Sequence, residues 1–194
     1  MMQVEFEAKF FVNFDKIKTK MKDLGGNPLR SRGLMRRFIF QDKENLNQWI
    51  RVRDELEYVA LTLKSFDPSA KDSIESVKEL EIRVSDFEKT AEIFECLGYK
   101  KSLYMENYRE IWSLQDCLVM FDELPGIEPF IEIEGPNKHS VEHIVSILGL
   151  DIKTAMYGPN SLLYEKKYGI TKAEFGGLTE ITFACHPGMS SYKK

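Results

Sequence analysis

Acidic side chains recur at every second position in two segments near opposite ends of the chain. Near the start the sequence reads EFEAK, with Glu5 and Glu7, and much later it reads IEIE, with Glu132 and Glu134. Residues two apart in an extended strand lie on one face, so each segment would present a pair of carboxylates. Carboxylate oxygens are the ligands that hard divalent cations such as Mg²⁺ and Mn²⁺ prefer. The two segments together therefore predict a metal site.

Basic side chains follow similar spacing in other segments. Arg51 and Arg53 alternate with apolar residues, Lys64 closes another alternating run, and Arg109 stands in a later segment. A guanidinium group offers a planar fork of donors that matches phosphate oxygens, and a lysine adds a point charge. Together with Lys9, which follows the first acidic pair, these residues predict a site for an anion with several phosphate groups.

Each charged face also has a plainer interpretation, in which it points at water. Antiparallel sheets commonly solvate one face, so a single pair such as Glu79 and Glu81 indicates little. The charged faces taken together indicate more than any single pair. Acidic pairs recur on three segments and basic residues on at least three others, and Asp122 adds another carboxylate.

Two periodicities predict the elements that carry these residues. Alternation of apolar and polar residues predicts strands at residues 4–10, 36–41, 48–53, 59–65, 76–84, 103–114, 117–122 and 129–134. Helical spacing of apolar residues predicts helices at residues 14–25, 85–97, 140–148 and 160–168. This order lacks the regular alternation of strand and helix that a parallel sheet requires, so we expect an antiparallel sheet.

The helices and the charged faces together predict how the sheet is arranged. Amphipathic helices need an apolar surface, which the strand faces opposite the charges provide, so the charges would point inward. An open sheet would bury these charges at high cost, whereas a barrel with a water-filled lumen removes the sheet edges and much of that cost. We therefore expect an α+β fold, a closed antiparallel eight-stranded β-barrel with helices packed outside. One domain is expected over residues 1–183, followed by a flexible tail over residues 184–194.

Composition limits the classes of partner. The chain has 194 residues and a formal net charge of −4, which argues against nucleic acid as a partner. Its three cysteines stand far apart and favour neither disulfides nor a zinc site. The sequence shows neither a signal-peptide pattern nor an apolar run of about 18 residues, so no membrane contact and a cytoplasmic location are expected. A homodimer is left open.

The ordered set of motifs resembles the CYTH-domain family, the group named for class IV adenylyl cyclases and thiamine triphosphatases. The resemblance spans about residues 1–170 and begins at the ExExK signature formed by Glu5, Glu7 and Lys9. It continues through WIRVR at 49–53, LTLK at 61–64, ELE at 79–81, YRE at 108–110, Asp122 and FIEIEG at 130–135. The resemblance implies a triphosphate tunnel, a barrel whose charged lumen binds a small-molecule triphosphate and divalent metal ions.

The resemblance also implies roles for individual residues in the lumen. The metal ions, Mg²⁺ or Mn²⁺, would be bound by Glu5, Glu7, Asp122, Glu132 and Glu134. The phosphates would be held by Lys9, Arg51, Arg53, Lys64 and Arg109. Catalysis would depend on Glu5, Glu7, Lys64 and Glu81, with Glu79 as a further lumen acid.

Some positions depart from the family pattern. Asn107 stands where many members carry a basic residue, so one phosphate contact would be absent. The strand at 36–41 lacks the tyrosine that thiamine triphosphatases pair with a lysine, which argues against that assignment. Arg36 and Arg37 could extend the basic wall, although we expect at least one of them on the surface. Trp49 is expected to face the outer core.

Three functions stay open. The leading prediction is metal-dependent hydrolysis of the terminal phosphate of inorganic tripolyphosphate or of an organic or nucleoside triphosphate. The alternative is a class IV adenylyl cyclase that converts ATP to cyclic AMP and pyrophosphate. A non-catalytic module that binds polyphosphate or a nucleotide is the third, and the acidic pairs argue against it because a pure binder needs the basic wall more than the metal site.

Overall fold

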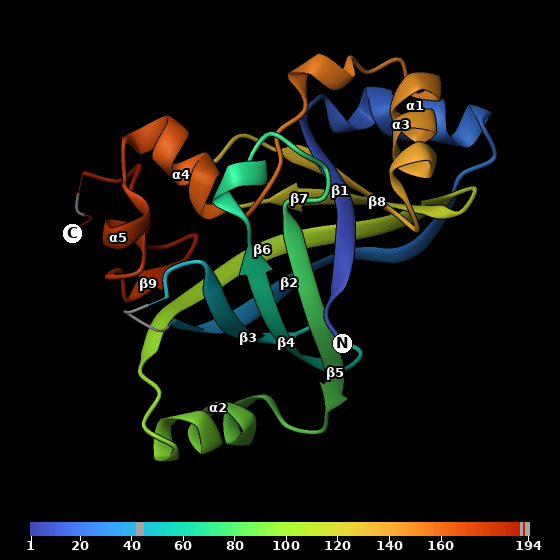
Figure 1. The fold of residues 1–194 in the computed structure, drawn as a ribbon. Coiled ribbons are helices and arrows are strands. Elements are labelled where there is room, and N and C mark those ends of the chain that lie inside the picture. Colours follow the sequence, from blue (N-terminus) through green and yellow to red (C-terminus); the bar gives the residue numbers. More distant parts are fainter. Residues whose placement is uncertain (42–44, 191, 193–194) are drawn as a thin grey trace.

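Eight strands form one closed sheet (Figure 1). The computed structural model describes residues 1–41, 45–190 and 192. Its barrel strands are β1 (Gln3–Phe11), β2 (Asn27–Gln41), β3 (Gln48–Asp54), β4 (Val59–Phe66), β5 (Val77–Val84), β6 (Lys101–Leu114), β7 (Cys117–Glu123) and β8 (Phe130–Gly135). They follow the order β2-β3-β4-β5-β1-β8-β7-β6 with antiparallel neighbours, and pairing of β2 with β6 closes the ring. The predicted closed, antiparallel, eight-stranded barrel is confirmed.

Alternation along each strand separates a charged interior from an apolar exterior. On β1, Ala8 and Phe10 pack outward in a core cluster, while Glu7 and Lys9 line the central cavity. On β8, Ile131 and Ile133 pack outward with them. Because side chains two apart share a face of the sheet, this two-residue period brings the charged residues of both strands into one lumen.

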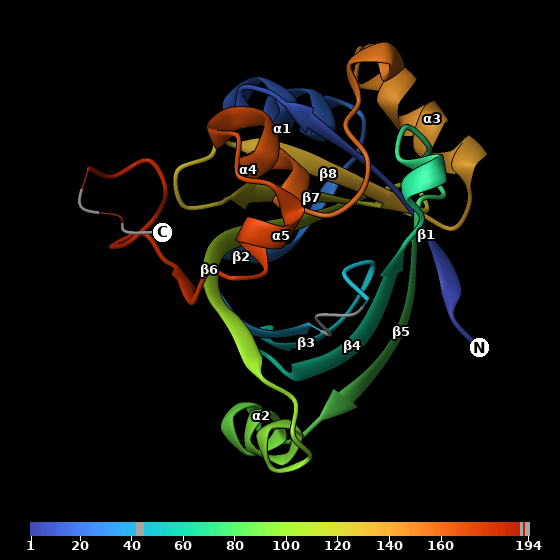
Figure 2. The same ribbon diagram turned by 60° about the vertical axis from the view of Figure 1, so that its left-hand side comes forward.

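Helices cover much of the exterior (Figure 2). Helix α1 (Phe14–Asp23) begins where the Asn13 side chain accepts a hydrogen bond from the Lys16 amide, and α3 (Lys138–Ile147) begins at Asn137 in the same way. Both helices bury their apolar stripes in the core cluster of β1, β7 and β8, whereas α2 (Phe87–Cys96) packs on β3. Within the described ranges no helix is long and apolar enough to cross a membrane.

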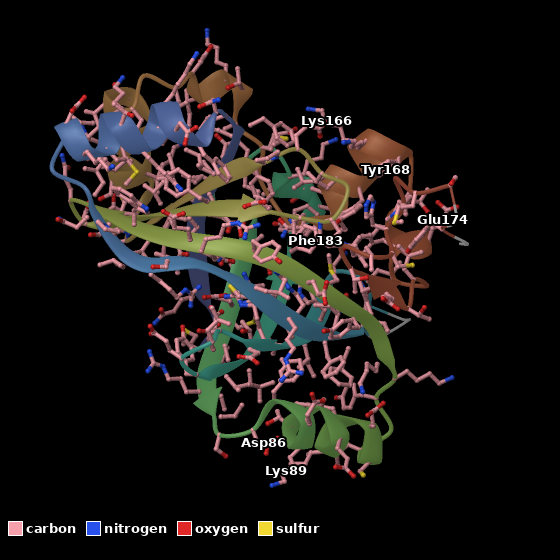
Figure 3. The ribbon with its side chains drawn as sticks, turned by 180° about the vertical axis from the view of Figure 1, so that it is seen from behind. Asp86, Lys89, Lys166, Tyr168, Glu174 and Phe183 are labelled. Atoms are coloured by element: carbon pink, nitrogen blue, oxygen red, sulfur yellow. The ribbon has the colours of Figure 1, made fainter. Side chains whose placement is uncertain are left out.

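The C-terminal segment lies against one end of the barrel. It holds α4 (Ser161–Tyr168), α5 (Lys172–Phe175) and the two-residue strand β9 (Glu180–Ile181), which pairs parallel to β6. Seen from behind in Figure 3, Tyr168 and Glu174 lie in these helices, and β2 and β6 cross the barrel together. Alternation and helical spacing predicted neither α5 nor β9, because elements of four and two residues are too short to show a period.

Strand β2 is longer than predicted. Alternation indicated residues 36–41, yet the strand begins at Asn27 and pairs with β6 over most of its length. Its register shifts between Pro28 and Arg30 and again between Arg30 and Gly33. Each shift interrupts the two-residue period, so residues 27–35 could not be recognised as a strand from their pattern.

The predicted tail of residues 184–194 is described only in part. Residues 191, 193 and 194 lie outside the described residues. The Cys185 carbonyl accepts a hydrogen bond of 2.8 Å from the Thr182 amide, and the Tyr192 hydroxyl donates one of 3.1 Å to the Glu180 carbonyl. These contacts join the described part of the tail to β9.

One expected apolar contact does not form. The outer faces of the strands were predicted to pack under helices, but Leu80 and Ile82 on β5 are 45% and 55% exposed. Neither side chain belongs to a core cluster in the described part of the chain. The reason is the placement of α2, which follows β5 in sequence but packs beside Phe38 and Val52 on β2 and β3.

A buried isoleucine on the outer face of the barrel and an exposed isoleucine on a covering helix should contribute differently to stability. Ile133 is fully buried beneath the helices, so Ile133→Ala should lower the free energy of unfolding by about 2–5 kcal/mol. Ile93 on α2 is 59% exposed, and Ile93→Ala should change it by no more than about 0.5 kcal/mol. Urea denaturation followed by circular dichroism measures both, and equal losses would contradict the packing described above.

Candidate active site

A cavity of about 320 Å³ lies inside the barrel, within the size range of small-molecule sites. Every site residue named from the sequence lines it except Asp122: Glu5, Glu7, Lys9, Arg51, Arg53, Lys64, Glu79, Glu81, Arg109, Glu132 and Glu134. These side chains come from β1, β3, β4, β5, β6 and β8, so the closure of the barrel brings together residues that are far apart in sequence.

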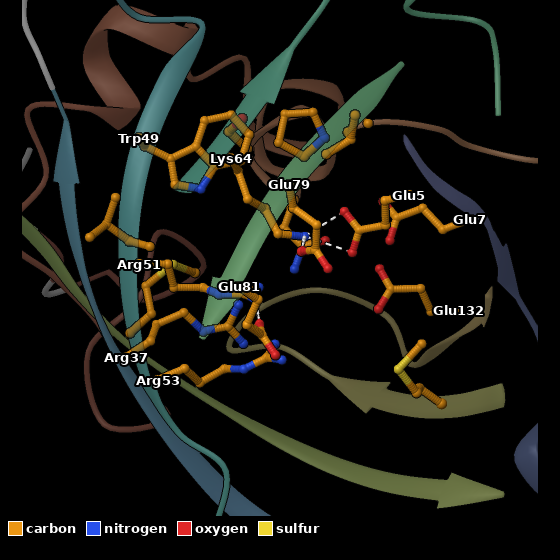
Figure 4. Close-up of a pocket in the computed structure, with 18 of the residues that line it drawn as sticks. Glu5, Glu7, Arg37, Trp49, Arg51, Arg53, Lys64, Glu79, Glu81 and Glu132 are labelled. Carbon is orange, nitrogen blue, oxygen red and sulfur yellow. Dashed lines mark hydrogen bonds and ion pairs between the residues drawn. The ribbon is translucent and has the colours of Figure 1, made fainter. Parts of the chain in front are cut away.

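The cavity has two chemically different walls (Figure 4). Glu5, Glu7 and Glu132 project from β1 and β8 on one side, while Arg51 and Arg53 project from β3 on the other. The strand order explains this separation, because β4 and β5 stand between the two walls in one direction round the barrel, and β7 and β6 in the other. An anion between the walls would have arginines on one side and carboxylates on the other.

Carboxylates crowd together on the acidic wall. Glu7 stands directly opposite Glu134 in the pairing of β1 with β8, an arrangement that repels like charges. Burial raises the pKa of Glu134 to about 7, and the Glu5 carboxylate adds to the effect. Burial also raises the pKa of Glu7, helped by Glu5 and Glu132. The wall therefore holds negative charge that lacks full compensation.

Two lysines partly neutralise this wall. Lys9 Nζ donates to Glu7 Oε1, lies 3.0 Å from Glu132 Oε1, and donates to the Gly158 carbonyl at 2.9 Å. Lys64 Nζ donates to both carboxylate oxygens of Glu5, at 2.5 and 2.7 Å. Burial by itself would lower the pKa of Lys9, but Glu7 and Glu132 raise it above the ordinary value, so Lys9 stays charged.

Three arginines form the basic wall. Arg37 on β2 stands opposite Arg53 on β3 in register, and Arg51 is the next inward-facing residue of β3. All three are at most 8% exposed, and the Nε atom of each has no hydrogen-bond partner among the residues that the structure describes. Burial, together with repulsion from Arg53, Arg51 and Arg109, lowers the pKa of Arg37 to about 9. Positive charge therefore exceeds negative charge on this wall.

Two acids hold part of the basic wall in place. The buried Glu55 carboxylate pairs with Arg53 and with Arg30 Nη1, which lies 3.2 Å away. Burial would raise the pKa of Glu55, but the neighbouring arginines lower it to about 2. The Thr62 hydroxyl donates to Glu81 at 2.7 Å, and Arg51 donates to the same oxygen at 3.4 Å.

Sequence reasoning missed one of these residues, Glu55, and left another, Arg37, open. Glu55 continues the alternation of Arg51 and Arg53, so its inward position could have been predicted from spacing. Arg37 could not, because the apolar Ile39 shares its face and obscures the pattern of β2. Of the two arginines left open, Arg36 points outward and pairs with Asp54 and Glu88, whereas Arg37 points into the cavity.

Asp122 lies behind the cavity wall. Its carboxylate accepts two hydrogen bonds from Arg109, of 2.8 and 2.6 Å, and Arg109 also pairs with Glu132. Asn107 joins this network, since its amide oxygen accepts from Arg37 and its amide nitrogen donates to Asp122 at 3.1 Å. Asn107, which stands where many family members carry a basic residue, thus binds Arg37. Arg37 brings a guanidinium group to this position from β2.

The structure corrects the prediction for Trp49, which lines the cavity instead of the outer core. Trp49 is two residues before Arg51, so the two side chains share a face of β3. It stands opposite Gln41, and Ile39 and Phe175 line the same cavity. The site therefore includes an apolar and aromatic surface beside its charged walls.

The acidic wall offers the oxygen donors that Mg²⁺ and Mn²⁺ prefer, in carboxylates from two neighbouring strands. Its raised carboxyl pKa values are also those expected where a cation would relieve repulsion. In the described part of the chain, however, no group of three or more His, Cys, Asp or Glu side chains is arranged to hold a metal ion. The donor chemistry fits a divalent cation, while the lysines occupy the carboxylate oxygens in this structure.

Several known proteins resemble this chain in sequence or in fold. A Methanocaldococcus jannaschii protein named "Putative adenylate cyclase MJ0240" is 26% identical over 137 residues, which cover 69% of this chain and 77% of that protein. The structure of the PH1012 protein from Pyrococcus horikoshii OT3 has a TM-score of 0.69 and 25% identity, covering 82% of this chain and 98% of that one. A Vibrio parahaemolyticus structure with 12% identity shares the fold alone, with a TM-score of 0.70 over 85% of this chain and 99% of that one.

The family model for the CYTH domain matches residues 3–161. That range begins at β1 and ends at the first residue of α4, so it contains both acidic pairs and the whole basic wall. A match over this much of the sequence, with the barrel and its charged lumen, establishes the relationship. The chain belongs to the CYTH domain family.

Proposed function

We propose that this protein is a divalent-metal-dependent enzyme that binds a triphosphate in the barrel and hydrolyses its terminal phosphate. The observation that carries the proposal is the buried basic wall, in which Arg37, Arg51 and Arg53 keep an unpartnered Nε atom. Buried arginines without enough counter-charge are costly, and a polyphosphate supplies both the charge and the acceptor oxygens. Inorganic tripolyphosphate and nucleoside triphosphates are the substrate class.

In this proposal the chain's own residues position the phosphates and neutralise charge. Arg37, Arg51, Arg53 and Arg109 would hold the phosphate oxygens and stabilise the charge that develops on the transferred group. A water attacks the terminal phosphorus, the bond from phosphorus to the bridging oxygen breaks, and diphosphate or its organic ester leaves. The proton of the attacking water passes to a lumen carboxylate.

A divalent cation would be held by the acidic wall, through Glu5, Glu7, Glu132 and Glu134. When bound, it would supply positive charge that neutralises the phosphates. Lys9 and Lys64 would then exchange carboxylate partners for phosphate oxygens, since both already line the cavity. Asp122 is proposed to orient Arg109 through its two hydrogen bonds, in addition to the metal role first predicted for it.

A second candidate activity is that of a class IV adenylyl cyclase. Trp49, Ile39 and Phe175 provide a surface on which an adenine ring could stack. The name of the Methanocaldococcus jannaschii relative points in the same direction. In that reaction the ribose 3′-hydroxyl attacks the α-phosphate and pyrophosphate leaves, so the products distinguish the two activities.

Adjacent arginines on β2 give a matched test of the basic wall. Arg37→Ala should lower kcat/KM by about 10²–10³-fold, because it removes a buried phosphate-binding donor. Arg36→Ala removes only surface ion pairs and should change kcat/KM by less than about fivefold. Phosphorus NMR with Mg²⁺ or Mn²⁺ follows tripolyphosphate and ATP separately, and the Glu5→Ala, Glu7→Ala double variant controls for contaminating enzymes.

The products decide between the candidates. Orthophosphate from tripolyphosphate, absent with the double variant, is the expected result. Cyclic AMP and pyrophosphate from ATP would instead establish the cyclase. Tight binding of either compound without turnover would show a non-catalytic module and contradict the enzyme proposal.

Trp49 should distinguish organic from inorganic substrates. Loss of a stacked ring costs about 0.5–1.5 kcal/mol, so Trp49→Ala should raise KM for ATP by about three- to tenfold. KM for tripolyphosphate should stay within about twofold, and Trp49→Phe should largely restore ATP binding. An equal change for both substrates would show that Trp49 supports the cavity without contacting an organic group.

Glu134 should make stability depend on pH. Its folded pKa of about 7 exceeds the ordinary value of 4.5, so the protonated carboxyl contributes stability that is lost as pH rises toward 7. Glu134→Gln keeps a neutral side chain, and its free energy of unfolding should rise relative to wild type over this window, by up to about 3 kcal/mol. Glu92→Gln on α2 should follow the wild-type curve.

Urea denaturation at a series of pH values measures this difference. Adding Mg²⁺ at pH 8 should stabilise the wild type more than Glu134→Gln, because the cation relieves the repulsion of Glu134 and Glu7. Parallel stability curves for wild type and Glu134→Gln would show that the carboxyl is not perturbed in the folded protein.

A further inference from the structure

The outer face of β5 leaves apolar side chains in solvent. Leu80 and Ile82 are 45% and 55% exposed, and Val84 continues the same face. Beside them on β4 stand the half-buried Leu63, in register with Leu80, and Leu61, in register with Ile82. Five apolar side chains thus form one contiguous surface, and surfaces of this kind commonly mark a contact with another protein.

The edge of the same strand is also open. Strand β1 pairs with β5 only through Val77, Lys78 and Glu79. Residues 80–84 therefore pair with β4 on one side, while no strand from the described ranges pairs with them on the other. An open edge presents backbone N–H and C=O groups to which a further strand can bind. Residues 80–84 thus have an open backbone edge, and three of them, Leu80, Ile82 and Val84, belong to the apolar surface.

The sequence of this edge is complementary to itself. If two copies paired antiparallel about a two-fold axis at Ile82, each Glu81 would stand opposite Arg83 of the second copy. On the outer face, Ile82 would stand opposite Ile82 and Leu80 opposite Val84. Shifting the axis to Glu81 or to Arg83 would place two like charges directly opposite each other, which is destabilising. Charge thus selects one register, and that register also pairs the apolar residues.

We propose that the protein forms a two-fold homodimer in which the β5 strands of two copies pair antiparallel, centred on Ile82. This pairing joins the two barrels through a continuous sheet and brings Leu80 and Ile82 into side-by-side contact with the apolar side chains of the second copy. It also places Arg83 of the second copy beside Glu81, whose carboxylate lines the cavity of the first. The inference rests on the outer face and the open edge, so it is independent of the proposed chemistry.

Oligomeric state tests the proposal directly. Sedimentation velocity of the full chain over a wide concentration range should show a species with twice the mass of one chain. Ile82→Arg, which places two arginines at the centre of the contact, should give a monomer. Leu29→Arg is the matched control, because Leu29 is 58% exposed on β2, outside the contact, and this variant should stay dimeric.

Charge reversal tests the register. Arg83→Glu should dissociate the dimer because it sets carboxylates opposite one another, and the double variant E81R/R83E should restore the dimer by exchanging the two charges. Far-UV circular dichroism confirms that each variant is folded. Restoration in the double variant cannot arise from a general loss of structure, so it reports the cross-strand pair itself.

A cross-link tests the centre of the pairing. Directly opposite residues have Cβ atoms about 4.5–5.5 Å apart, near the separation that a disulfide requires. Ile82→Cys, combined with Cys96→Ser to remove an exposed thiol, should form a covalent dimer on mild oxidation, whereas Leu29→Cys with the same change should not. The proposal would be overturned if the wild type were a monomer at all concentrations. It would also be overturned by a dimer that Ile82→Arg leaves intact and that Ile82→Cys does not cross-link.

Discussion

The structure depends on the balance of charge inside a closed barrel. Lys9, Glu7, Arg37 and Glu132 are all at most 7% exposed, so their charges have lost most of their contact with water. Such burial is tolerable only where opposite charges or hydrogen bonds compensate. On the acidic wall two lysines provide much of this compensation. On the basic wall the compensation is incomplete, because the Nε atoms of Arg37, Arg51 and Arg53 have no hydrogen-bond partner among the described residues.

The strand order converts this balance into a binding site. Because the arginines lie on β2 and β3 and the carboxylates on β1 and β8, the two sets cannot neutralise each other directly. Residues on the strands between them, such as Lys64 and Arg109, connect the walls through ion pairs with Glu5 and Glu132. A metal-bound polyphosphate would complete both walls at once, which is why the geometry favours that ligand over a simple anion.

The end of the site that carries apolar groups is built partly by the C-terminal segment. Lys172 and Phe175 line the cavity from α5, which lies beyond the range that matches the family. Lys172 donates to the Asn47 side chain at 2.6 Å and so joins α5 to the segment that precedes β3. The charged walls thus lie within the range that matches the family, whereas part of the cavity's apolar lining comes from α5, beyond that range.

The two-residue spacing predicted the inward-facing side chains correctly wherever polar and apolar residues alternated strictly. It placed Glu5, Glu7 and Lys9 in one lumen, and the same rule applied to β3 would have placed Trp49 beside Arg51. It failed for Arg37, where an apolar residue shares the inward face. It could not place α5 or β9, which have four and two residues and are too short for a period to repeat.

The sequence by itself determined which face of each strand is charged, because side-chain direction alternates with every residue of a strand. It also determined that the sheet must close, since the charged faces and the amphipathic helices could not otherwise both be satisfied. Only the tertiary structure decided that Asp122 stands behind Arg109 and that α2 leaves Ile82 uncovered. Those outcomes depend on strand register and on distances across the barrel, which arise from pairings between residues far apart in the chain and leave no local pattern.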